Sequence, residues 1–96
     1  MITGTTQNGY AFEVNENISK DFRIVIATAR LNSDDTMEKV NGTYDYVTAI
    51  LGKQGLNKLI EFAIERCGFA DTEFIVSEAR EILTIAAEKY AEIKKS

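Results

Sequence analysis

The hydrophobic and polar positions of the chain repeat with one period over the first fifteen residues and with another over the rest. Apolar and polar residues alternate over residues 10–14, which is typical of a strand that buries one face. Asn8 and Gly9 precede this run and favour the two-residue turn of a β-hairpin, because they accept positive φ angles. The pattern therefore predicts a hairpin over residues 1–15.

A two-residue loop would set the register of this hairpin. Thr5 would pair with Phe12, and Thr3 with Val14. Because side chains alternate between the faces of a strand, Tyr10 would join Phe12 and Val14 in one apolar row. Thr3 and Thr5 would lie beside that row. A lone hairpin is marginal in water, so we expect the row to pack on helices or on a strand of another chain.

Residues 17–96 repeat with the period of a helix instead, and four apolar stripes follow one another. The first stripe consists of Ile18, Phe22, Val25, Ile26 and Ala29. The second consists of Met37, Val40, Tyr44, Val47 and Leu51. The third consists of Leu56, Leu59, Ile60, Ala63 and Ile64, and the fourth of Ile75, Ala79, Ile82, Leu83, Ala86, Tyr90 and Ile93. We expect each stripe to face a shared core.

Glycines mark the expected ends of these helices. Gly52 and Gly68 are placed to end the second and third helices in a left-handed conformation. The short joint at Gly52 would then fold the two helices back as an antiparallel pair. For Asn41-Gly42, inside the second stripe, two interpretations stay open: a glycine tolerated within a helix at a cost of about 1 kcal/mol, or a turn, with the firm helix beginning near Thr43. We slightly favour the turn.

These elements predict a mainly α fold of the α+β class, a small bundle of about four helices with an N-terminal β-hairpin. The length of 96 residues indicates a single domain over residues 1–96. No run of apolar residues is long enough to span a membrane, and no secretory leader opens the chain. Together with a single cysteine, Cys67, this favours a soluble protein of a reducing cytoplasm.

Candidate chemistry is scarce. The chain has no histidine, which removes the commonest general base and the commonest zinc ligand. Glutamate pairs such as Glu78 and Glu81 are expected to be solvent-exposed, and Cys67 lies on an apolar stripe, as a buried structural thiol would. We therefore predict no enzyme activity, no catalytic, cofactor-binding or metal-binding residue, and no cofactor. The net charge of −4 argues against a nucleic-acid partner, because binding phosphates needs clustered bases.

The chain carries more hydrophobic residues than the four stripes account for. Those off the stripes include Ile24, Ala27, Leu31, Phe62, Phe74 and Ile85. Either a small irregular core uses them, or they form an exposed interface of the kind that clustered surface apolar residues mark. On the second interpretation the candidate partner-binding residues are Ile24, Leu31, Phe62 and Ile85.

The order of these segments resembles the small tail assembly chaperones of long-tailed (siphovirus-type) bacteriophages. The likeness covers nearly the whole chain and depends on short motifs. They are the hairpin NGYAFEV at 8–14, the helix start ISKDF at 18–22, the acidic loop at 32–35, the joint ILGKQ at 50–54, LNKL at 56–59, and a terminal helix from Thr72. Phe22 stands where the family more often has a residue like tryptophan.

The resemblance implies a non-enzymatic factor that binds the tape measure protein and helps recruit tail tube protein during virion morphogenesis. It also implies a location in the host cytoplasm, absence from the mature virion, and scope for self-association. The family often makes a longer product by frameshifting, and Lys94-Lys95 would fit a run of slippery codons. Two alternatives stay open: a structural phage component such as a head–tail connector subunit, and a small helical regulatory protein.

Overall fold

The structure, a computed structural model, describes the backbone of residues 1–95 and the side chains of residues 1–94. Over this range the elements are β1 (Ile2–Thr5), β2 (Ala11–Val14), the 3₁₀ turn η1 (Ile18–Lys20), α1 (Phe22–Leu31), α2 (Thr36–Cys67) and α3 (Thr72–Lys95). The expected fold class is confirmed, because a mainly helical chain follows an N-terminal antiparallel hairpin. The main differences from expectation concern which faces of the helices point inward.

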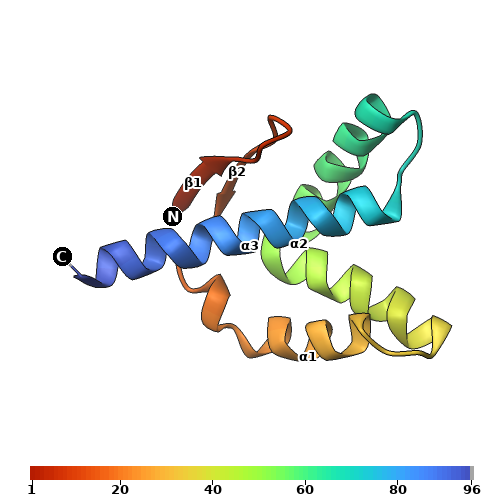
Figure 1. Cartoon of the computed structure of the whole chain (residues 1–96), viewed down its shortest axis with the longest axis horizontal. Coiled ribbons are helices and arrows are strands. Elements are labelled where there is room, and N and C mark those ends of the chain that lie inside the picture. Colours follow the sequence, from red (N-terminus) through yellow and green to blue (C-terminus); the bar gives the residue numbers. More distant parts are fainter. Residues whose placement is uncertain (96) are drawn as a thin grey trace.

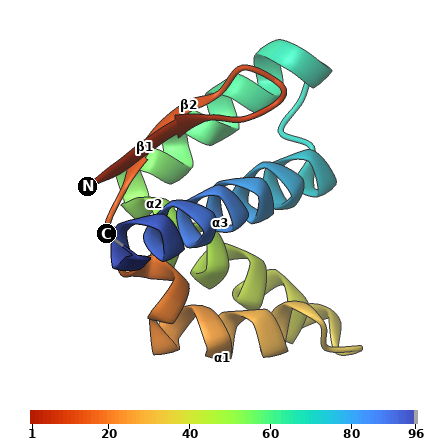
Figure 2. The ribbon, with the colours of Figure 1, turned by 60° about the vertical axis from the view of Figure 1, so that its left-hand side comes forward.

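α3 is the central element of the fold. In Figure 1 the hairpin and the second half of α2 lie on one side of α3, and α1 with the first half of α2 lies on the other. Figure 2 shows the same two layers, with the hairpin beside the second half of α2. The most deeply buried apolar residues come from α2 and α3, and they include Val47, Leu59, Ala63, Ala79, Ile82 and Ala86. Much of the hydrophobic stabilisation is therefore concentrated around α3.

The hairpin has a three-residue loop instead of the expected two-residue one. Gly9 has a φ of 94°, whereas Asn8 does not have the positive φ that a type I′ turn requires. The Gly9 amide donates to the Thr6 carbonyl at 2.9 Å, and the Thr6 amide donates to the Tyr10 carbonyl at 2.9 Å. This is the pattern of a type I turn followed by a glycine bulge, and it shifts the register by one residue.

The shifted register changes what faces the core. Phe12 pairs with Gly4 and Val14 with Ile2, so Thr3 and Thr5 are not opposite the residues expected. Phe12 and Val14 are buried as predicted, and Ile2 is buried beside them. Thr3 and Thr5 are exposed, so their expected place beside the apolar row is wrong.

α1 packs with a different face from the predicted one. The exposed residues of this helix include the predicted stripe, Phe22, Val25, Ile26 and Ala29. The buried residues are Ile24, Ala27 and Leu31. Both faces are apolar, so periodicity alone could not rank them. The observed rotation also lets the Arg30 guanidinium donate a 2.7 Å hydrogen bond to the Asp45 carboxylate on α2.

Asp21 caps the start of α1. Its carboxylate accepts hydrogen bonds from the backbone amide of Arg23 at 2.9 Å and from the Arg23 guanidinium. These hydrogen bonds, that of the side chain above all, lower the pKa of Asp21 to about 2. An acidic cap also interacts favourably with the helix dipole.

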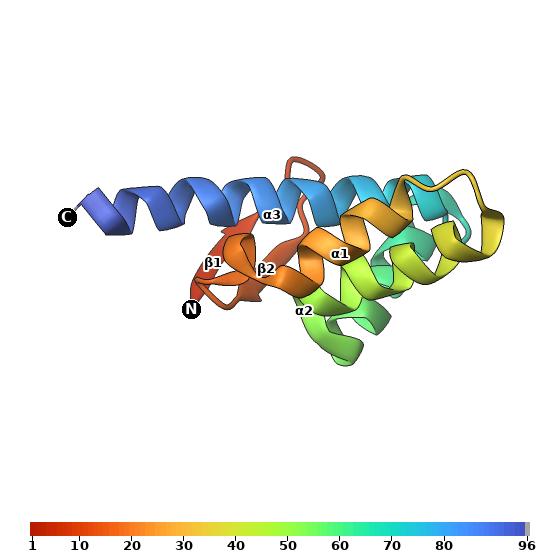
Figure 3. The same cartoon turned by 90° about the horizontal axis from the view of Figure 1, so that it is seen from below.

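The Asn41-Gly42 pair does not break α2, so the favoured interpretation of a turn is wrong. Gly42 is buried inside a continuous stretch of helix. A Cβ atom at this position would lie 2.5 Å from the backbone nitrogen of Leu31 and 2.7 Å from the carbonyl carbon of Arg30. Glycine is therefore needed here to let α1 and α2 approach at backbone distance. Figure 3 shows α1 lying along this half of α2.

Gly52 divides α2 into an N-terminal arm (residues 36–51) and a C-terminal arm (residues 53–67). Its φ of 77° and ψ of 173° fall in a region that is essentially restricted to glycine. The arms diverge from this residue in Figures 1 and 3. The predicted joint is correct in position, but the expected antiparallel pair is wrong. The predicted helix end at Gly68 is confirmed, with a φ of 84°.

Replacing Gly52 by alanine is expected to lower the free energy of unfolding by about 1–3 kcal/mol. The cost arises from backbone strain alone, because a Cβ atom at this position would meet nothing within 4 Å. Urea unfolding followed by circular dichroism measures it. Lys53→Ala, at the exposed next position, is the matched control and should change stability by less than about 0.5 kcal/mol. Equal stability of the two variants would contradict the kinked conformation.

Candidate functional site

The four predicted partner-binding residues are used in the protein's own packing. Ile24 is only 5% exposed and Leu31 only 7%, so their expected place outside the core is wrong. Phe62 and Ile85 are half-buried and pack against the core. The interpretation of an irregular core therefore describes these four positions.

Aromatic packing explains the position of Phe62. Its ring centroid lies 5.1 Å from that of Tyr10 and 5.9 Å from that of Phe74. The Arg66 guanidinium lies over the Phe62 ring at 5.0 Å. This cluster joins the hairpin, the C-terminal arm and α3, because each element supplies one of the three rings. The sequence places Phe62 off the main stripe, but the hairpin covers it.

A different set of apolar residues is exposed. Phe22, at 71% exposed, and its neighbours Val25 and Ile26 form a patch on α1 that we call the α1 stripe. The N-terminal arm of α2 exposes three residues of its predicted stripe, Met37, Val40 and Tyr44. The prediction that these faces point inward is wrong. Hydrophobic surface is nevertheless left over, as the sequence indicates.

The largest concave feature lies between the two arms of α2 and α3. We call it the V groove; it has a volume of about 1000 Å³. Its apolar lining includes Val40, Tyr44, Val47, Leu56, Ile60 and Val76. The kink at Gly52 creates the groove, because it directs the C-terminal arm away from the N-terminal arm. A smaller groove of about 420 Å³ lies between Ile26 of the α1 stripe and the Gly52 region.

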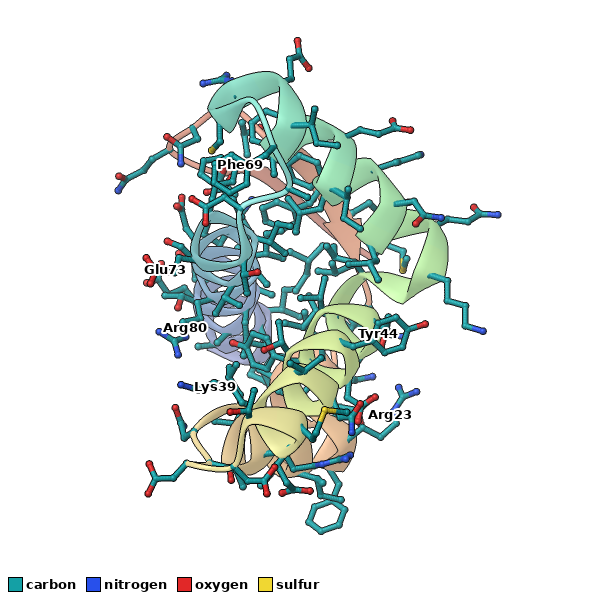
Figure 4. The ribbon with its side chains drawn as sticks, turned by 90° about the vertical axis from the view of Figure 1, so that its right-hand side faces the viewer. Arg23, Lys39, Tyr44, Phe69, Glu73 and Arg80 are labelled. Atoms are coloured by element: carbon teal, nitrogen blue, oxygen red, sulfur yellow. The ribbon has the colours of Figure 1, made fainter. Side chains whose placement is uncertain are left out.

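Charged side chains stand along the rim of the V groove. They are Asp34, Lys39, Glu73 and Arg80. Figure 4 looks into the groove and shows Glu73, Arg80 and Lys39 in that order along one side, with Tyr44 on the other. None of the four rim charges forms an ion pair with another residue that the structure describes.

The environment of the rim is shown by Tyr46, which is buried in the N-terminal arm. Burial raises the pKa of the Tyr46 phenol, and the positive charge of Arg80 opposes that rise. Arg80 is therefore close enough to the core to be felt there, while its guanidinium remains exposed. The V groove combines an apolar lining with separated, unpaired charges, which is an arrangement suited to binding an amphipathic segment.

Glu78 is a structural residue that the sequence prediction misplaced. It is only 1% exposed, so the expectation of a solvent-exposed glutamate pair is wrong for this residue. Its carboxylate accepts hydrogen bonds from the Thr6 hydroxyl at 2.7 Å and from the Asn8 side-chain amide at 3.0 Å. The neighbouring Glu81 accepts one from the backbone amide of Gln7 at 2.6 Å. Together the two glutamates hold the hairpin loop on α3.

One signal in the sequence points to the burial of Glu78. The residue lies three positions after Ile75 and four before Ile82, so it falls on the buried stripe of α3. A polar residue on such a stripe is buried with a partner or lies at its edge. The partner comes from the hairpin, far away in the sequence.

Two further observations bear on chemistry and location. Among the residues that the structure describes, no group of three or more histidine, cysteine, aspartate or glutamate side chains could hold a metal ion. Cys67 is half-buried. Over residues 1–95, none of the helices combines the length and the apolarity required to cross a membrane.

Comparison of the chain with models of protein families, with curated proteins and with solved structures finds no match. The V groove and the α1 stripe are therefore the features from which a function is inferred.

Proposed function

We propose that this protein is a non-enzymatic tail assembly chaperone of a long-tailed bacteriophage, which binds the tape measure protein in the V groove. The observation that supports this proposal is the groove itself, an apolar channel of about 1000 Å³ that the protein's own helices leave open. The order of the sequence segments supports the choice of the phage family. On this proposal the protein also helps recruit tail tube subunits, acts in the host cytoplasm, and leaves before the virion is complete.

The physical basis of the proposed carrier role is burial of apolar surface. A helical segment that would aggregate in water can bury its apolar face in a groove lined by other helices. The net charge of −4 would help to keep such a complex soluble. The α1 stripe would provide a second apolar contact, for the same segment or for another copy.

Co-expression tests the proposal directly. With the wild-type protein present, the tape measure protein encoded beside it is expected to remain in the supernatant after centrifugation. Without it, the tape measure protein should precipitate. Equal precipitation in both cases would show that the proposed function is wrong.

Two matched substitutions locate the contact. Val40→Asp places a charge in the V groove, and Val25→Asp places one on the α1 stripe; both positions are exposed, so neither should unfold the protein. Val40→Asp is expected to abolish the solubilising effect, because burying an unpaired carboxylate is costly. Val25→Asp should retain most of it. The reverse result would move the contact to the α1 stripe.

Mass spectrometry of purified virions separates the proposed function from the main alternative. A chaperone of this kind is expected to be absent from the particle. A stoichiometric amount in the particle would instead favour a structural component such as a head–tail connector subunit.

A further inference from the structure

We propose that the V groove recognises an amphipathic partner helix by two opposite charges spaced two helical turns apart. The partner's acidic residue would lie beside Arg80 and its basic residue beside Glu73. This inference rests on the proposed function for the identity of the partner chain, and it adds a rule for which segment of that chain binds.

The shape of the lining favours a helix as the occupant. Val40, Tyr44 and Val47 follow one another at steps of three and four along the N-terminal arm, so they present a helical face to the groove. α3 supplies the opposite wall. Two walls made of helices leave a channel that a third helix can fill by ordinary side-chain interdigitation, at the 8–10 Å spacing between axes that is usual for packed helices.

The charges of the rim are arranged for a partner that carries both signs. Glu73 and Arg80 both belong to α3, so their Cα atoms are about 10 Å apart along one helix axis. Lys39 lies beyond Arg80 on the same side of the groove (Figure 4), which strengthens the positive end. Neither Glu73 nor Arg80 has an ion-pair partner among the described residues. A fourth rim charge, Asp34, belongs to the loop between α1 and α2.

This arrangement disfavours two other occupants. A nucleic acid presents charges of one sign, so Glu73 would repel it. A second copy of α1 would bring an apolar stripe, but its arginines are already paired. Arg23 is bound to Asp21, and Arg30 is bound to Asp45 at 2.7 Å. The second copy would therefore leave the charges of the rim without partners.

Binding of three synthetic helical peptides tests the inference. The peptides share one apolar stripe and differ only at two flanking positions, seven residues apart, that carry Glu and Lys, Glu and Glu, or Gln and Gln. Fluorescence anisotropy with the wild-type protein is expected to give the tightest binding for Glu/Lys, then Gln/Gln, then Glu/Glu. Each step should be about threefold, because a contact between exposed charges contributes up to about 1 kcal/mol. The differences should shrink at high salt.

A charge reversal in the groove should invert this preference. In Glu73→Lys the charges on α3 become uniformly positive, so the Glu/Glu peptide is expected to bind most tightly. Glu88→Lys, on the same helix but outside the groove, is the matched control and should keep the wild-type order. Circular dichroism of both variants checks that they fold, which is expected because Glu73 and Glu88 are exposed.

The possible outcomes separate this inference from the proposed function. If all three peptides bind the wild-type protein and Glu73→Lys equally, recognition by charge is wrong, while the chaperone proposal stands on the co-expression result. If none of the peptides binds although the tape measure protein is kept soluble, the V groove is not the binding site. If light scattering shows a dimer that the peptides dissociate, a second copy occupies the groove and the inference is overturned.

Discussion

Replacing Glu78 by alanine is expected to lower the free energy of unfolding by about 2–3 kcal/mol, because two donors lose a buried charged acceptor. The Thr6 hydroxyl would be affected most, since Thr6 is only 4% exposed and donates to Glu78 at 2.7 Å. The loss should concentrate in the hairpin. Hydrogen exchange is expected to show reduced protection of the Thr6 and Gly9 amides, whose hydrogen bonds close the loop.

Two controls give this prediction its specificity. Glu88→Ala removes an exposed glutamate from the same helix and should change stability by less than about 0.5 kcal/mol. A double-mutant cycle with Thr6→Ala should give a coupling energy of about 1 kcal/mol or more, as expected for residues in direct contact. A coupling near zero would show that the contact between Thr6 and Glu78 does not hold the loop.

Replacing Gly42 by alanine is expected to destabilise the fold by about 2 kcal/mol, although alanine is the better helix former by about 1 kcal/mol. The added Cβ atom would lie 2.5 Å from the backbone nitrogen of Leu31, and a backbone atom cannot rotate out of the way as a side chain can. α1 would have to move away from α2. Urea unfolding measures the loss of stability.

The residue before Gly42 provides the matched control. Asn41 is exposed on the same turn of α2, so Asn41→Ala should be neutral or slightly stabilising through helix propensity. Spectroscopy of the Arg30 side chain offers a second readout, because its 2.7 Å contact with Asp45 should weaken when α1 moves. A Gly42→Ala variant as stable as Asn41→Ala would contradict the close approach of the two helices.

Expectations that depend on local chemistry are confirmed. The hairpin is present because alternation and a turn-forming Asn-Gly pair act over a few residues. The buried stripe of α3 is confirmed through Ala86, because one of its faces is clearly more apolar than the others. Gly68 ends α2 in the left-handed conformation that a helix end of this kind requires.

Expectations that depend on a distant partner are less reliable. Glu78 is buried because the hairpin loop, far away in sequence, supplies its hydrogen-bond donors. Phe62 is covered by Tyr10 of the same hairpin. The register of that hairpin differs by one residue because a single glycine bulge extends its loop, and periodicity does not distinguish the two turn types.

The sequence by itself determined the kinds of element, their order, and an excess of apolar residues over what four stripes need. Only the tertiary structure decided which of those residues remain outside. α1 has two apolar faces, and contacts at Gly42 and Asp45 select the one that is buried. The position of the V groove was decided in the same way, because the conformation of Gly52 sets the divergence of the two arms. Periodicity describes each helix alone, whereas burial depends on the surface that another helix presents to it.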